Sequence, residues 1–317
     1  MAIKTLAHVS DLHLGKNVET ERRAIGIRDA LLAADVDHVV ITGDLTHKGR
    51  HGELAAFWRI FSCFRDRNRL TIIPGNHDCL GDDLSETIQE GPRVTVARAP
   101  GLHLVRFNST GPHNRSWLNG QGAMSAEDIH AIERAASTAG RGDVVAVLLH
   151  HHVLPLPADH PAERLSEWFG WPYAEELQKG TALVAALRGR CDLILHGHRH
   201  TPRTSTFFQE ESRPLSIFNA GSSTELGRVR VFCHDEGALM SEPGWLSTWT
   251  APTPQQPERR PAHARGAADG LPRAPRSNLT VDAGSAKPSL WVLGPGRVAP
   301  SGAAIAGADI YDSFFRS

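Results

Sequence analysis

The chain has few cysteines, methionines and tyrosines, and it has no long hydrophobic run. Its 317 residues include four cysteines, three methionines and two tyrosines. The cysteines are far apart and form no Cys-x-x-Cys pair, which argues against a thiolate zinc site or a disulfide framework. We therefore expect buried thiols in a reducing compartment at Cys63, Cys79, Cys191 and Cys233. The longest apolar run, Val144 to Leu149, is too short to cross a bilayer.

The chain also lacks a strong net charge of either sign. The formal net charge at pH 7 is −1, so no overall field favours nucleic acid or a membrane surface as a partner. The N-terminus leads directly into a strand-like run, which leaves no room for a signal peptide. We therefore expect a cytoplasmic protein with no membrane partner and a small molecule as substrate.

Strand-like apolar runs alternate with helix-like segments over the first two-thirds of the chain. Several runs are almost wholly apolar, as is typical of strands buried on both faces. The runs are Ile3–Val9, His38–Thr42, Leu70–Ile73, Leu102–Phe107, Val144–Leu149 and Leu193–Leu195. Helical spacing from Leu54 to Phe64, a capping-box-like pair at Ser125 and Asp128, and Thr181–Leu187 indicate helices between them. The alternation predicts an α/β sheet with helices packed on it.

The pattern changes twice in the last third. Shorter strand-like runs follow His200, at Arg203–Phe208, Leu215–Asn219 and Val229–Cys233, and we expect them to form a more antiparallel sheet edge. Residues 252–317 then hold nine of the twenty prolines and no periodic apolar pattern. We therefore predict a domain over residues 1–250 and a disordered, Pro-rich tail over residues 251–317.

Five short groups of metal-binding residue types each end a strand-like run. They are Asp11-Leu12-His13, Gly43-Asp44, Gly75-Asn76-His77-Asp78, His150-His151-His152 and Gly197-His198-Arg199-His200. Any one of them alone is compatible with ordinary turn chemistry. Because the carboxyl ends of parallel strands meet at one edge of a sheet, the five together predict a single metal site.

In order and spacing, these groups resemble the signature of the calcineurin-like metallophosphoesterase superfamily, and most closely that of bacterial class III cyclic-nucleotide phosphodiesterases. The resemblance covers residues 1 to about 250. It implies an α/β fold, an αββα sandwich of two mixed sheets flanked by helices, with the metal site at strand C-terminal ends. It also implies a binuclear phosphoester hydrolase acting on 3′,5′-cyclic nucleotides or related small phosphodiesters through a metal-bridging hydroxide.

The resemblance assigns a ligand role to seven residues. Asp44 would bridge two ions, Asp11, His13 and His200 would complete the first ion's shell, and Asn76, His150 and His198 the second's. Two ions about 3.5–4 Å apart can activate a water and clamp a phosphate. Imidazole, carboxylate and amide donors without thiolate suit Mn, Fe or Zn.

The same resemblance places His77 at the scissile phosphate as an electrostatic stabiliser or general acid. Asp78 would then orient the imidazole of His77 and raise its pKa. Apolar residues run unbroken to Leu149, so His150 is favoured as the ligand over His151, which alternation along a strand would point the other way.

Several positions near these groups allow two interpretations. Asn108, Arg115 and Arg199 are candidate substrate contacts, although both arginines also fit a solvated surface. His47 and His51 follow the Asp44 loop and are candidates for the entrance of the site. The segment Leu154–Tyr173 has the length and tryptophans of a lid, or of plain packing against the sheet.

Two other functions fit parts of the sequence. The stretch from Asp11 to Gly15 is shared with nucleases of double-strand-break repair, but a basic stripe for DNA is missing. A non-catalytic scaffold on the same fold would lack ligands or the histidine of the Gly-Asn-His group, and every one of these positions is filled here.

Overall fold

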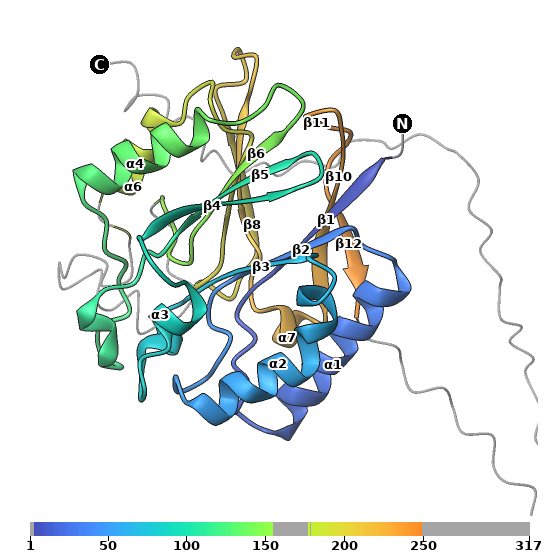
Figure 1. Cartoon of the computed structure of the whole chain (residues 1–317), viewed down its shortest axis with the longest axis vertical. Helices are drawn as coiled ribbons and strands as arrows, with labels where there is room; N and C mark the ends of the chain where they lie inside the picture. The colour runs from blue at the N-terminus through green and yellow to red at the C-terminus, as the bar shows by residue number, and fades with distance from the viewer. Residues whose placement is uncertain (1–2, 155–176, 178, 249–317) are drawn as a thin grey trace, which may run out of the picture. The chain divides into compact units, whose positions relative to one another are not determined.

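The computed structural model describes residues 3–154, 177 and 179–248. Within this part, two six-stranded mixed sheets are flanked by helices (Figure 1). The predicted α/β sandwich is therefore confirmed. The lid predicted within Leu154–Tyr173 falls outside the described residues except for Leu154, and the tail predicted over 251–317 falls wholly outside them.

The first sheet has the order β11-β10-β1-β2-β3, with β12 also pairing with β10. Strands β1, β2 and β3 are parallel, and β10 is antiparallel to β1. The strands are β1 (Lys4–Val9), β2 (His38–Thr42), β3 (Leu70–Ile73), β10 (Arg228–Asp235), β11 (Ala238–Leu239) and β12 (Gly244–Ser247). Helices α1 (Val18–Ala33) and α2 (His51–Arg65) connect the parallel strands.

The second sheet has the order β4-β5-β6-β7-β9-β8. Its four central strands are parallel, and β4 and β8 are antiparallel edges. The strands are β4 (Val94–Ala99), β5 (Leu102–Phe107), β6 (Val144–Leu148), β7 (Leu193–His196), β8 (Arg203–Phe207) and β9 (Leu215–Asn219). Helices α4 (Ala126–Ala136) and α6 (Gly180–Ala186) lie beside this sheet (Figure 1).

Side-chain alternation along β1 and β2 builds two cores. Leu6 and Val40 face the second sheet and pack in a cluster that includes Leu104 and Leu195. Their neighbours in the chain face the opposite way, in a cluster with Phe57 and other side chains of α1 and α2. Because both faces of these strands are buried, their sequences read as continuous apolar runs.

Short elements complete the description. They are the 3₁₀ helices η1 (His77–Cys79) and η2 (Pro112–Arg115) and the helices α3 (Ser85–Ile88) and α7 (Ser223–Leu226). No helix in the described ranges is long and apolar enough to cross a membrane. All four cysteines are free; two are buried as expected (Cys79 and Cys191), and the other two are partly exposed.

Three sequence expectations about secondary structure need correction. The strands after His200 do not form one edge, because β8 and β9 extend the second sheet and β10 returns to the first. Helix α1 was missed because its apolar stripe is weak, and only Ala24, Ile27 and Leu31 among its apolar residues are buried. Strand β4 was missed because an edge strand alternates between exposed and half-buried residues.

Candidate metal centre

The loops at the C-terminal ends of five strands bring the predicted metal ligands together. The loops follow β1, β2 and β3 of one sheet and β6 and β7 of the other. Backbone hydrogen bonds join them: Asp11 N–H donates to the Gly43 carbonyl (3.2 Å), His13 N–H to the Asp44 carbonyl (3.0 Å), and Gly197 N–H to the His150 carbonyl (3.1 Å). The site therefore lies at the edges of two sheets, and not at one edge of a single sheet as expected from the sequence.

The Asp44 carboxylate lies between two sets of donors. Its Oδ2 is 3.7 Å from His13 Nε2, and its Oδ1 is 3.4 Å from His150 Nε2. The backbone N–H of His77 donates to Oδ1 (2.9 Å), which fixes the carboxylate's orientation. A carboxylate whose two oxygens face different histidines is suited to bridge two cations.

The first set of donors consists of Asp11, His13 and His200. Their nearest ligand atoms all lie within 4.8 Å of one another. Nε2 of His200 is 3.2 Å from Nε2 of His13 and 3.8 Å from the Asp11 Oδ1. Two imidazole nitrogens and a carboxylate oxygen at this separation form a donor set for one cation.

The second set centres on the side-chain amide of Asn76. Its Oδ1 is 3.0 Å from His150 Nε2 and 3.0 Å from His198 Nδ1. Nδ1 of His150 donates to the Thr42 carbonyl (2.8 Å), which turns Nε2 toward the centre. All seven predicted ligands thus converge, and their nitrogen and oxygen donors fit two transition metal ions.

Burial and neighbouring charges shift the pKa of these groups. Burial alone raises the pKa of the Asp44 carboxyl, but the imidazoles of His150 and His77 outweigh it and hold the pKa well below its usual range. Burial disfavours the His150 cation, yet Asp44 and Asp11 raise its pKa to about 9, so a metal ion that binds there would have to displace this proton. Burial lowers the pKa of His13 far enough to keep that imidazole neutral, as a metal ligand must be.

Four of the predicted ligands have strained backbone angles. Asp11, His13, Asp44 and His198 have φ values of 53°, 48°, 51° and 70°, in the left-handed region that side chains rarely adopt. A Cβ at Gly75 would collide with the Asp44 side chain and backbone. Only glycine therefore allows the loops of the second and third groups to approach so closely.

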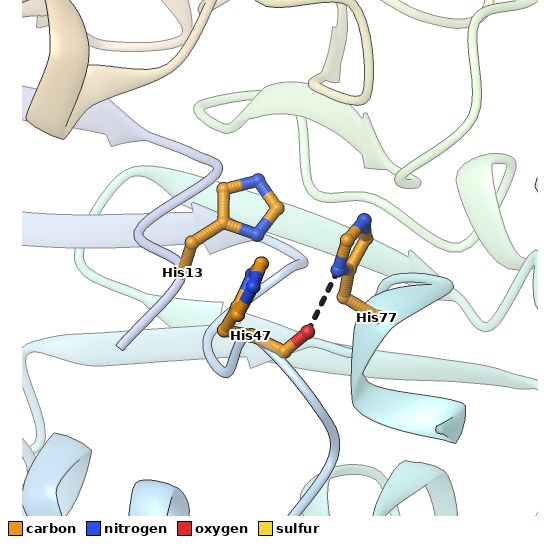
Figure 2. Close-up of side chains that lie close together, drawn as sticks. All are labelled: His13, His47 and His77. Atoms are coloured by element: carbon orange, nitrogen blue, oxygen red, sulfur yellow. Dashed lines mark hydrogen bonds between the residues drawn. The ribbon is translucent and has the colours of Figure 1, made fainter. Parts of the chain in front are cut away.

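A hollow of about 200 Å³ opens over the two sets of donors. We call it the metal hollow; its lining residues are Asp44, Asn76, His77, Trp117, Leu118, Gly120, His198 and His200. On one side, the half-buried imidazole of His77 faces that of His13, with ring centroids 4.6 Å apart. Nδ1 of His77 donates to the carbonyl oxygen of His47 (2.9 Å; Figure 2).

The structure corrects the partner of the His77 ring. Its partner is the His47 carbonyl, whereas the buried Asp78 carboxylate accepts hydrogen bonds from the backbone of Leu45, Thr46 and Gly75 and from the Thr46 hydroxyl. Burial and the nearby Asp44 raise the pKa of Asp78 to about 6. Asp78 therefore holds the loops that carry Asp44 and Asn76, and does not orient the imidazole.

The three candidate substrate contacts are not among the residues that line the metal hollow. Asn108 accepts hydrogen bonds from the backbone and hydroxyl of Thr110. Arg115 pairs with Asp83 at 2.8 Å, and the side chain of Arg199 is 7% exposed. A local turn accounts for the position of Asn108 and an ion pair for that of Arg115, and contact of the three residues with substrate stays a prediction.

Two histidines that are not predicted ligands, His151 and His47, lie next to the site. His151 is buried, and its Nδ1 is 2.8 Å from the Ser109 hydroxyl, which places it behind His150. The half-buried His47 lies beside His77, with ring centroids 5.7 Å apart, but it is not among the residues that line the metal hollow.

Two contacts of the site were not anticipated. Oε2 of Glu225 lies 3.0 Å from His200 Nδ1, and Lys16 Nζ lies 3.0 Å from the other oxygen of the same carboxylate. Trp117 reaches the metal hollow from the loop after η2. Glu225 is 25 residues from His200, in a segment without a motif, so no local pattern could have found it.

Comparison with known families decides the affiliation. A model of the family described as "Calcineurin-like phosphoesterase" matches residues 4–202, which span all five groups of ligands. The chain belongs to the calcineurin-like phosphoesterase family. It is a hydrolase that acts on phosphoester bonds, in a family that uses dinuclear metal sites.

Two curated relatives of this phosphoesterase have low sequence identity to it, and the matches cover nearly their whole length. It is 24% identical over 255 residues to a protein named "Probable cyclic nucleotide phosphodiesterase" from Vesicomyosocius okutanii, covering 76% of this chain and 99% of the relative. A protein of the same name from Ruthia magnifica is 21% identical over 243 residues, covering 75% and 95%.

Among solved structures, a dimetal phosphatase from Danio rerio superimposes with a TM-score of 0.51 at 13% identity. The match covers 78% of this chain and 99% of that protein. At this identity the likeness supports the fold of the phosphoesterase and not its substrate.

Proposed function

We propose that this phosphoesterase hydrolyses small phosphodiesters, with 3′,5′-cyclic nucleotides as its substrates, at a centre of two Mn, Fe or Zn ions. The observation that carries the proposal is the position of Asp44, with one oxygen toward His13 and the other toward His150. The names of the two curated relatives support the choice of substrate class.

Each donor set would hold one ion, with Asp44 shared between them. When bound, two such ions act as Lewis acids that activate water and neutralise phosphoryl charge. The amide of Asn76 contributes an oxygen donor without a negative charge, so it does not repel an anionic diester as a second carboxylate would. The hydrogen bond from the backbone N–H of His77 to Asp44 Oδ1 keeps the shared carboxylate in place.

His77 would act on the leaving group. Because its Nδ1 donates to the His47 carbonyl, Nε2 is the nitrogen left for the substrate. A protonated Nε2 can donate to the leaving oxygen, and an imidazole in this position also stabilises charge that develops on the phosphate. The carbonyl of His47 fixes the orientation of the ring.

The size and charge of the site favour a small substrate over DNA. The metal hollow has a volume of about 200 Å³, and the chain's net charge of −1 provides no field to attract a polyanion. Neither the size of the metal hollow nor the net charge of the chain favours a nuclease.

The experiment is a substrate panel on protein that is stripped with a chelator and then loaded with Mn²⁺, Fe²⁺ or Zn²⁺. The panel contains 3′,5′-cyclic AMP, bis-p-nitrophenyl phosphate, p-nitrophenyl phosphate and single-stranded DNA. We expect metal-dependent turnover with the highest kcat/KM for the cyclic nucleotide. Asp44→Asn should abolish it, and the matched control Asp66→Asn, at an exposed position, should not. A higher kcat/KM for the monoester, or steeply salt-dependent cleavage of DNA, would overturn the proposed substrate.

A further inference from the structure

Two large apolar side chains stand exposed at the rim of the metal hollow. Trp117 is 58% exposed and Leu118 is 88% exposed, and both line the hollow. Other large apolar side chains that are exposed in the described residues occur singly, so this is the one consecutive pair there. Adjoining exposed apolar side chains beside a polar hollow make this rim a candidate ligand-binding surface.

The position of Trp117 is built into the structure. Its ring meets the imidazole of His77 edge-on, with centroids 5.0 Å apart and an interplanar angle of 90°. It meets the ring of His47 in a similar way, at 5.6 Å and 68°. The tryptophan therefore adjoins the residue that the proposed mechanism places at the leaving group.

The loop that carries the pair is anchored by a buried side chain. Asn114 is 1% exposed, and its amide donates to the carbonyls of Asn119 (2.7 Å) and Gln121 (3.0 Å). Its Oδ1 accepts the backbone N–H of Gly111 (2.8 Å). These hydrogen bonds hold the loop on both sides of Trp117 and Leu118. They therefore fix the position of the apolar pair at the hollow.

We propose that Trp117 and Leu118 form a wall that receives the nucleobase of the substrate by stacking and apolar contact. The inference rests on the proposed function and narrows it to diesters with a flat aromatic group. An indole accepts any base, because stacking on an aromatic ring is tolerant of base identity. The hollow of about 200 Å³ has room for one small organic group beside the proposed metal donors.

The test compares two substrates that share one scissile bond. 3′,5′-Cyclic AMP carries a base, and methyl ribofuranoside 3′,5′-cyclic phosphate does not. Trp117→Ala should raise KM for cyclic AMP about tenfold with little change in kcat, which is the pattern of lost ground-state binding and lies within the range for base stacking. The same variant should change KM for the abasic substrate much less than KM for cyclic AMP, and Trp117→Phe should restore most of the affinity for cyclic AMP.

Controls separate the wall from the fold and from the proposed function. Trp245→Ala removes a partly exposed tryptophan on β12 and should leave both KM values unchanged. If Trp117→Ala alters both substrates equally, or neither, the base does not rest on this wall.

A binding measurement keeps the inference testable where turnover fails. Failure of the wild-type protein to hydrolyse either cyclic substrate would overturn the proposed function alone. Quenching of tryptophan fluorescence by AMP would then decide the inference. Loss of the quenching in Trp117→Phe supports the wall, and equal quenching in wild type and variant refutes it.

Discussion

Replacing Glu225 should weaken the binding of one metal ion and leave the binding of the other unchanged. Glu225 lies 3.0 Å from Nδ1 of His200, whose Nε2 faces the donors of the first ion. The predicted ligands of the second ion are Asn76, His150 and His198, and no contact of Glu225 reaches them in the described residues. A carboxylate behind a ligating imidazole fixes its tautomer and raises its basicity, so Glu225→Ala removes a support of only one ion.

The magnitude follows from the exposure of the contact. Loss of such a partner costs 10- to 100-fold in metal affinity at well-buried sites. The Glu225 side chain is 46% exposed, and Lys16 shares its charge, so solvent screens the interaction. We expect the lower end, about tenfold, or about 1.4 kcal/mol for one ion.

The measurement is isothermal titration of the stripped protein with Mn²⁺, in which we expect two binding events. In Glu225→Ala one event should weaken about tenfold and the other should stay within twofold, and the control Glu90→Gln, on the exposed surface, should change neither. His200→Ala combined with Glu225→Ala should weaken binding no more than His200→Ala alone, because the carboxylate acts through the imidazole. Equal weakening of both events, or none, would refute the assignment of His200 to a separate first ion.

Three further predictions follow from the site and the core. His77→Ala should lower kcat on 3′,5′-cyclic AMP by about 10²- to 10⁴-fold, and lower it much less on bis-p-nitrophenyl phosphate, whose leaving group needs no acid; equal losses would remove the acid role. Asp78→Ala should lower the free energy of unfolding by about 3–5 kcal/mol in urea titrations with EDTA, because it leaves several buried backbone N–H groups unpaired; a change below about 1 kcal/mol would contradict the role of Asp78 as a tie between loops. Burial, with Arg69 and His234 nearby, lowers the pKa of His38 to about 4. The unfolded chain therefore takes up a proton below about pH 6.5 that the folded protein refuses until about pH 4, so stability is present at pH 7.5 and is lost as the pH falls. His38→Gln should remove about 2 kcal/mol of the loss between pH 7.5 and pH 5, and an unchanged pH dependence would show that His38 is not the group responsible.

Much of the fold could be predicted because its strands carry their own signal. β2, β6 and β7 are buried on both faces, and their apolar runs mark them within a residue or two of their bounds. The edge strand β4 and the helix α1 escaped prediction, since neither presents a strong apolar pattern. The sheet to which β10 belongs could not be read either, because pairing between distant strands leaves no local trace.

What the sequence by itself determined is which short groups carry the site. Each group follows a strand, and the carboxyl ends of parallel strands gather at one edge of their own sheet. The resemblance to the family, carried by the order of the groups, then selected seven ligand positions among them. The packing of the two sheets brings the three groups of the first sheet against the two of the second.

Only the tertiary structure decided which contact each polar side chain of the site makes. The tie from His77 to the His47 carbonyl, the loop contacts of Asp78 and the support of His200 by Glu225 join segments that are 25 or more residues apart. Which atom meets which across such a gap depends on the paths of loops and on strained backbone angles, as at Asp44. Hydrophobic periodicity encodes the face of a strand but not these paths, and so the roles of neighbouring polar residues became visible only once the loops were in place.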